Sequence, residues 1–156
     1  MRSLPKSNLL VLALALLVAA CDTPVVYHSY HALPVGGWAK DDTLVFPLSV
    51  ADTLPATFRL FVEVRNNTAY PYRDLSLVVA QNLEDSTVTT TDTLVFALAD
   101  STGLWTGRGW GSLYQSETFV RDVRTQGAGI YTVAIRSGMS DERLMGVNDV
   151  GVRLEK

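Results

Sequence analysis

Cys21 is the residue whose chemistry can be read most directly, because it is the only cysteine of the chain and follows a run of small side chains. The tetrapeptide Val18-Ala19-Ala20-Cys21 resembles the bacterial lipobox, in which the thiol is diacylated and the signal peptide is then cut just before it. An acylated thiol is no longer available for a disulfide or for catalysis. Two acyl chains bury enough methylene groups to hold a protein stably on a membrane without further contacts.

The segment before Cys21 has the organisation of an export signal. Arg2 and Lys6 form a basic start, and Leu9 to Ala20 form an apolar run without a polar residue. A membrane-spanning helix needs about twenty apolar residues, so this shorter run suits a signal peptide better. The alternative is an uncleaved apolar N-terminus with a chance cysteine.

Three parts are therefore expected: a cleaved lipoprotein signal peptide at 1–20, a lipidated tether at 21–34 and a single domain at 35–156. Without the signal, 11 of the 13 basic side chains remain against 16 acidic ones, a formal net charge near −5. Phosphate binding needs clustered Lys and Arg, so this acidic balance excludes nucleic acid as a partner. We expect the protein to be anchored to a membrane of the cell envelope by the acyl chains on Cys21. The outer membrane is favoured over the inner one.

The remaining chemical groups do not combine into a catalytic or metal site. The only histidines, His28 and His31, are three positions apart, which places them on opposite faces of an extended strand. That spacing disfavours a shared metal and leaves no Ser-His-Asp arrangement. The paired acids Asp41-Asp42 and Glu84-Asp85 are typical of solvated turns. We predict no catalytic residue, no metal, no cofactor and no enzymatic activity.

A stretch rich in glycine and tryptophan stands out near residue 107. Its pattern Gly107-x-Gly109-x-Gly111 lacks the strand and the Lys-Ser/Thr that a phosphate loop requires. Glycine at alternate positions removes side chains from one strand face and permits close approach of another group. Trp105 and Trp110 are odd-spaced, so the two rings are expected on different faces, one in the core. A purely structural role is the alternative to binding. The candidate partner-binding residues are Trp105, Arg108, Trp110, Tyr70 and Tyr72.

Five short motifs resemble the Asp-Ser/Thr-apolar acceptor of O-glycans on exported proteins of many gliding bacteria. The simpler explanation is that Asp and Thr are common where strands begin. The candidate acceptor hydroxyls are those of Thr43, Thr53, Ser86, Thr93 and Ser101.

Period-2 alternation of apolar and polar residues runs through most of the domain and predicts strands. The clearest case is Thr57 to Arg65, where Phe58, Leu60, Val62 and Val64 share one face. Pro47 removes a ladder donor and indicates an edge strand. The segment from Asp42 to Leu48 recurs as Asp92 to Leu98, which indicates two equivalent strands. We expect one helical turn at Gly138 to Leu144 and no long amphipathic helix. The predicted fold is an all-β, antiparallel β-sandwich of about eight or nine short strands.

Several patterns together resemble the GldH family of gliding-motility lipoproteins. They occur in order along nearly the whole mature chain: the lipobox ending at Cys21, Trp38 with Asp42 to Phe46, Arg65-Asn66-Asn67, Tyr70 to Leu75, Gly103 to Gly109, Gly129-Ile130-Tyr131 and Leu144 to Arg153. The resemblance implies a cell-envelope lipoprotein required for surface gliding and tied to the secretion apparatus that serves it. The family brings no catalytic residues.

Two functions follow as hypotheses. The first, implied by the resemblance, is a structural or assembly lipoprotein that contacts envelope proteins of the gliding and secretion apparatus. The second is a surface carbohydrate-binding sandwich. A row of coplanar exposed rings would favour sugar, whereas an apolar patch beside an open strand edge would favour a protein partner.

Overall fold

The computed structural model describes residues 24–51 and 53–156. The expected signal peptide and Cys21 therefore lie outside the described residues. Within those residues the regular elements are strands, and no helix has the length and apolarity needed to span a bilayer. The strands are β1 Val25–Ala32, β2 Trp38–Ala39, β3 Thr43–Val50, β4 Ala56–Asn67, β5 Asp74–Gln81, β6 Thr90–Ala97, β7 Arg108–Trp110, β8 Leu113–Thr125, β9 Gly129–Ser137, β10 Arg143–Leu144 and β11 Val147–Glu155.

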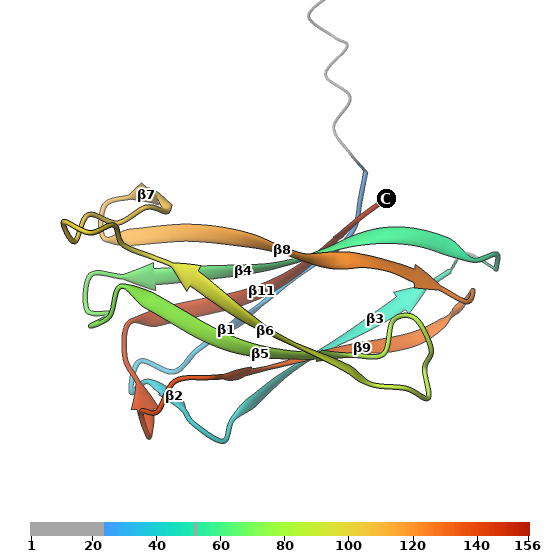
Figure 1. The fold of residues 1–156 in the computed structure, drawn as a ribbon, viewed down its shortest axis with the longest axis horizontal. Coiled ribbons are helices and arrows are strands. Elements are labelled where there is room, and N and C mark those ends of the chain that lie inside the picture. Colours follow the sequence, from blue (N-terminus) through green and yellow to red (C-terminus); the bar gives the residue numbers. More distant parts are fainter. Residues whose placement is uncertain (1–23, 52) are drawn as a thin grey trace, which may run out of the picture.

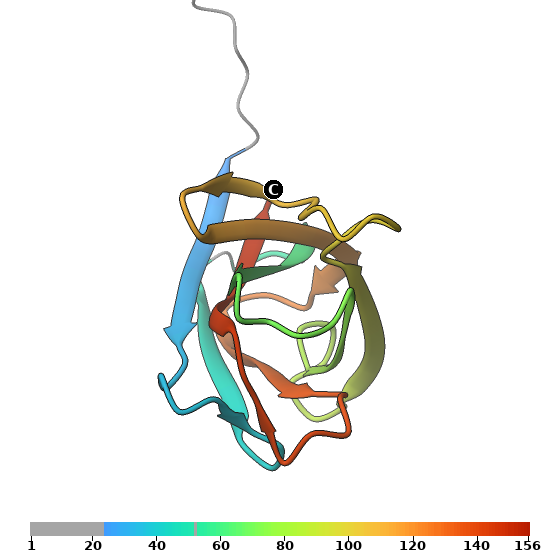
Figure 2. The ribbon, with the colours of Figure 1, turned by 90° about the vertical axis from the view of Figure 1, so that its left-hand side faces the viewer.

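The strands form two main antiparallel sheets that pack face to face (Figure 1). The first has the order β1-β11-β4-β8-β7 and the second the order β3-β9-β5-β6, while β10 and β2 make a small separate ladder. Seen from one end, β1 lies along one flank and β6 along the other (Figure 2). The predicted antiparallel β-sandwich is confirmed.

The core lies between the two sheets and follows the alternation of β4. Phe58, Leu60, Val62 and Val64 all point inward and are buried, as predicted from their shared face. Burial of each such side chain stabilises the fold by about 1.5–3 kcal/mol. The facing sheet contributes its own inward rows, which include Leu75, Leu77, Val79, Val133 and Ile135.

The repeated motif occupies equivalent places in the fold. β3 and β6 are the two edge strands of the four-stranded sheet. Each buries the Phe and the final Leu of its motif, Phe46 and Leu48 in one and Phe96 and Leu98 at the end of the other. Pro47 lies on the β3 edge, where a missing N–H removes no ladder bond to a further strand. The repeat therefore reflects two strands that occupy equivalent positions at opposite edges of the same sheet.

The predicted helical turn at Gly138 to Leu144 is wrong. The end of this segment instead forms β10, in which Leu144 pairs with Trp38 of β2. Both side chains are buried, and the Trp38 indole N–H donates to the carbonyl of Asp42 at 3.1 Å. Burial at this end of the sandwich outweighs the local preference for a turn of helix.

β1 lies inside the range expected as a tether. Val25 to Ala32 pair with β11 along their length, so the ordered sheet includes residues well before position 35. Next to it, the backbone N–H of Lys156 donates to the carbonyl of Pro24 at 3.1 Å. The first and last described residues therefore meet at the same place on the sheet.

Candidate functional site

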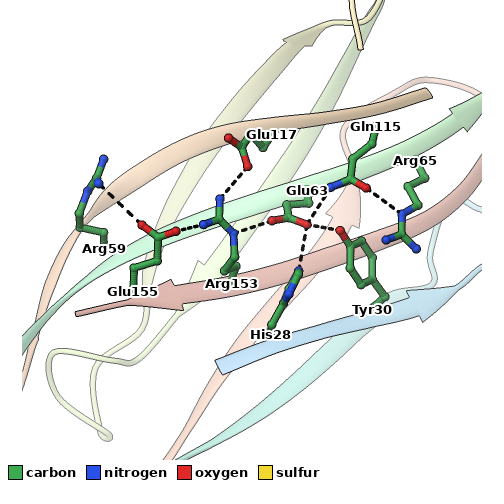
Figure 3. A network of polar contacts seen from close by, with 9 residues as sticks. All are labelled: His28, Tyr30, Arg59, Glu63, Arg65, Gln115, Glu117, Arg153 and Glu155. Carbon is green, nitrogen blue, oxygen red and sulfur yellow. Dashed lines mark hydrogen bonds and ion pairs between the residues drawn. The ribbon is translucent and has the colours of Figure 1, made fainter. Parts of the chain in front are cut away.

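A polar network covers the outer face of the five-stranded sheet, the face turned away from the core (Figure 3). Its centre is Glu63 in the middle of β4. Successive residues of a strand alternate between faces, so Arg59, Phe61, Glu63 and Arg65 all project outward. The side chain of Glu63 is nevertheless only 2% exposed, because neighbouring side chains lie over it.

Four donors surround the Glu63 carboxylate. Oε1 accepts from Arg153 Nε at 2.6 Å. Oε2 lies 3.0 Å from His28 Nε2 and accepts from the Tyr30 hydroxyl and, at 3.4 Å, from Gln115 Nε2. The donors come from β1, β11 and β8, on both sides of β4. The carboxylate therefore ties four strands of the sheet together.

Gly151 makes the Tyr30 contact possible. The registers place Gly151 of β11 between Tyr30 of β1 and Glu63 of β4 in one row across the sheet. A Cβ at position 151 would lie 2.6 Å from Tyr30 Cε1, closer than any stable contact. The missing side chain lets the Tyr30 ring lie across β11 and bring its hydroxyl to the carboxylate.

The network extends along the sheet through arginine. Arg153 reaches Glu117 Oε2 at 2.6 Å through Nη2 and also pairs with Glu155. Arg59 lies 3.7 Å from Glu155 at the far end. Arg153 stacks over the Phe61 ring at 4.5 Å from the centroid, an arrangement that favours a cation over an aromatic face.

These contacts change the acidity of the central groups. Burial raises the pKa of Glu63, but hydrogen bonds from Tyr30, Arg153 and His28 outweigh it, so the net pKa is lowered. Burial, reinforced by the hydrogen bond to Glu63, raises the pKa of Tyr30. The carboxylate is thus ionised and the phenol neutral near pH 7.

Glu63 is arranged to stabilise the sheet rather than to react. Both carboxylate oxygens accept hydrogen bonds from fixed donors, which leaves no free oxygen directed at a substrate. In the described residues no group of three or more His, Cys, Asp or Glu side chains is placed to hold a metal. His28 bonds to Glu63, whereas His31 faces the other sheet, where its Nε2 lies 2.9 Å from the Val45 carbonyl oxygen.

The β7–β8 hairpin carries the most exposed aromatic ring of the described residues. Gly111, with φ of 65°, and Ser112 form a two-residue turn of the II′ kind, which favours glycine first. Trp110 pairs with Leu113 beside this turn and its side chain is 93% exposed. Trp110 and Leu113, together with Arg65 and Arg108, line a hollow of about 310 Å³ on the outer face. This apolar and cationic tip, defined by Arg65, Arg108, Trp110 and Leu113, is called the hairpin surface.

The glycines of this hairpin serve the fold itself. A Cβ at Gly107 would lie 2.8 Å from the Gln115 carbonyl oxygen, and one at Gly109 would lie 2.5 Å from the Tyr114 ring. The expected room for another chain beside these two glycines is therefore filled by β8. Trp105 stacks on Tyr114 with centroids 5.6 Å apart and is half-buried, on the face opposite Trp110.

The two tyrosines of the candidate site have different environments. Tyr70 is only 3% exposed and its hydroxyl donates to the Asp74 carbonyl at 2.9 Å. Its placement on a binding surface is wrong, because the ring fills the core. Tyr72 is exposed and its hydroxyl donates to Asp141 Oδ1 at 2.7 Å, which raises the pKa of the phenol. Neither tyrosine joins the hairpin surface.

The five candidate acceptor hydroxyls all belong to exposed residues: Thr43, Thr53, Ser86, Thr93 and Ser101. In two motifs the aspartate has a local role. Asp85 Oδ1 accepts from the N–H and hydroxyl of Thr87, and Asp100 does the same for Thr102. These bonds lower the pKa of both aspartates. The turns account for the sequence pattern at these two positions without modification, which stays a prediction.

The Glu63 network was not found from the sequence. Its members come from four strands, and their register decides which side chains meet. The sequence did contain one signal. Phe61 and Glu63 lie between two arginines on the outward face of β4, and a face that is simply turned to solvent does not need an aromatic residue there. Such a mixture of aromatic and charged residues on the outward face indicates a covered surface.

The fold and the site together define a class: a small antiparallel β-sandwich with a saturated polar network and a protruding aromatic hairpin. The matching family model describes the GldH lipoprotein and covers residues 25–154. The gliding motility lipoprotein GldH of Flavobacterium johnsoniae is 33% identical over 96% of both chains. A GldH homolog of Christiangramia forsetii is 30% identical over 90% of both. The chain belongs to the GldH family of gliding-motility lipoproteins, and is accordingly a membrane-anchored lipoprotein.

Among solved structures, a family 35 carbohydrate-binding module of Clostridium thermocellum aligns with a TM-score of 0.38 and 14% identity. The alignment covers 84% of this chain and 91% of that module. A similarity of this size carries no inference about ligands.

Proposed function

We propose that this protein is a non-enzymatic assembly component of the gliding-motility machinery and of the protein-secretion apparatus associated with it. It acts from the cell envelope, anchored by acyl chains on Cys21, at the outer membrane rather than the inner one. Its relatives are named for gliding motility, which supports the cellular setting. The work of the domain is to bind other envelope proteins.

The observation that carries this proposal is the hairpin surface. A tryptophan held almost fully in solvent gains nothing for the fold, whereas Trp and Arg are the side chains that dominate protein interfaces. Trp110 and Leu113 supply apolar area, and Arg108 has no ion-pair partner in the part of the chain that the structure describes. The hairpin surface therefore fits a protein contact.

The carbohydrate alternative has less support. A sugar-binding face would use a row of coplanar exposed rings, but Trp110, Phe119 and Tyr72 lie on separate elements. Among the described residues, no contact between aromatic rings is formed by two of these three side chains. Their arrangement favours a protein partner.

The test separates binding from folding. Trp110→Ala and Arg108→Ala should melt cooperatively near the wild-type temperature, because both side chains are exposed. Each should nevertheless lose the envelope proteins that co-purify with the wild type from detergent-solubilised membranes. Val95→Ala, a truncation of an exposed apolar residue on β6, is the matched control and should keep them. Retention of every co-purifying protein by Trp110→Ala would refute the proposal.

A further inference from the structure

β8 presents an unpaired edge to solvent next to the hairpin surface. β8 spans Leu113–Thr125, but the three residues of β7 pair only with Leu113, Tyr114 and Gln115. From Ser116 onward, the side of β8 turned away from β4 has no strand partner among the described residues. Such an edge exposes main-chain N–H and C=O groups that can pair with another chain.

A groove lies along this edge. β6 is the outermost strand of the second sheet, and the space between β6 and β8 has a volume of about 570 Å³. Phe96 and Ala97 form one wall, and Thr106 and Gly107 close the end where the chain enters β7. The floor is the β8 segment from Gln115 to Thr118.

The hairpin register indicates which main-chain groups are free. In a two-residue hairpin the closing pair, here Trp110 and Leu113, exchanges hydrogen bonds, and the direction of bonding alternates along each strand. Odd-numbered residues of this part of β8 therefore direct their N–H and C=O away from β4. For Glu117 and Phe119 these groups meet no strand in the described chain.

Just beyond Phe119 the edge is interrupted by two of the devices with which natural proteins block pairing, a bulge and a charge. The β4–β8 register shifts between Leu60 and Phe61, which leaves Val120 as an extra residue in β8. Next to it, Arg121 Nε lies 3.3 Å from Asp92 of β6 and bridges the two sheets. The window from Ser116 to Phe119 is the unpaired part of the described edge that lies between β7 and this bulge.

We propose that this window binds an extended segment of a partner envelope protein by β-strand addition, in line with β7. This inference rests on the proposed assembly function and names its mode of contact. Main-chain bonds to Glu117 and Phe119 would supply affinity, and alternate side chains of the segment would enter the groove beside Phe96 and Ala97. A single extended segment could lie along β8 beside β6, whereas a strand of a second copy would bring its neighbouring strands against β6.

The experiment uses the full-length, membrane-anchored protein in its host. Benzoyl-phenylalanine, a photo-crosslinker, replaces Phe119, an aromatic residue at the window that is 45% exposed. We expect an adduct with another envelope protein. The same probe at Val45, which is 48% exposed on the opposite flank, should give none.

The role of the main chain is tested by two changes at one position in the probe-bearing protein. Glu117→Pro removes the N–H at the free edge and should reduce the adduct about tenfold. Glu117→Gln keeps that N–H and an acceptor for Arg153, and should keep most of the adduct. If Glu117→Pro lowers the melting temperature sharply, Ala97→Arg replaces it, because it fills the groove from an exposed position on β6.

The outcomes are distinct. Absence of an adduct at Phe119, an adduct of twice the mass of the chain, or equal loss with proline and glutamine would each overturn strand addition. Loss of the partner with Trp110→Ala but not with Glu117→Pro would leave the assembly function standing and refute only the strand. If both variants keep the partner, the assembly function and strand addition are both refuted.

Discussion

Glu63 stabilises the sheet because four donors converge on a carboxylate that water hardly reaches. Hydrogen bonds to a charged group contribute about 1.5–3 kcal/mol each when a partner is removed. Exposed ion pairs such as Lys40 with Glu142, 3.9 Å apart, contribute far less. The contributions of the Glu63 and Glu142 carboxylates to the free energy of unfolding can therefore be compared by measurement.

Glu63→Gln should lower the free energy of unfolding by about 2–3 kcal/mol at pH 7, because the neutral amide cannot replace a charged acceptor and adds an unpaired donor. Urea denaturation followed by circular dichroism measures this loss. The matched control, Glu142→Gln, should change stability by less than about 0.5 kcal/mol.

The same residue predicts a pH dependence. The folded pKa of Glu63 lies below its ordinary value. Its contribution is therefore fully present above the unfolded pKa of about 4.3 and is lost as pH falls through the folded pKa. Wild-type stability should fall more steeply below about pH 4.3 than that of Glu63→Gln. Parallel curves for the two proteins would contradict the assignment.

Gly151 and Tyr30 should behave as one unit. Gly151→Ala pushes the Tyr30 ring off β11, and Tyr30→Phe removes the same hydroxyl contact with the charged Glu63, so each should cost about 1.5–3 kcal/mol. The double variant should cost about as much as either single one, because both remove one interaction. Simple addition in the double-mutant cycle would show that the two positions are independent.

At the scale of elements, β4 organises the molecule. Its inward row forms the centre of the core and its outward row holds the network. Leu60→Ala should cost about 2–5 kcal/mol, through lost transfer energy and the cavity that remains. Guanidinium unfolding measures it, with exposed Val95→Ala as the control that should stay near wild type. An unchanged Leu60→Ala midpoint would contradict the core assignment.

Local patterns predicted the elements better than their contacts. Alternation within one segment was enough for the strands and for the inward face of β4, and the missing N–H of Pro47 was enough for its edge position. Tyr70 was misplaced because a Tyr-Pro-Tyr link has no periodicity that separates a buried ring from an exposed one. The Glu63 network and the free edge of β8 depend on registers among strands distant in sequence. No local pattern contains that information.

At the scale of the whole molecule, the registers fix which end carries the hairpin. Val25 of β1 pairs with Glu155, which pairs with Arg59, whereas the hairpin pairs with Asn67 at the other end of β4. Arg59 and Asn67 are eight positions apart along β4, which corresponds to about 26 Å. An anchor at Cys21, four residues before Val25, therefore leaves the hairpin surface at the far end of the domain.

Cys21→Ser should release the protein from the membrane fraction, because serine lacks the thiol that would carry the anchoring acyl chains. Mass spectrometry of the wild-type N-terminal peptide should show acyl groups on Cys21. Membrane retention of the serine variant, or a mature N-terminus at another residue, would contradict lipidation at this position.

The attachment of β1 determines how the domain responds to pulling. If the anchor is held and a partner moves the hairpin end along the surface, the load enters at Val25 and runs parallel to β1. The seven residue pairs between β1 and β11 are then loaded together, in shear, rather than one after another as in a zipper. Glu63 adds side-chain links from β1 across β11 through His28 and Tyr30. Under such a load, the pairs between β1 and β11 would have to break together before the edge strand could detach.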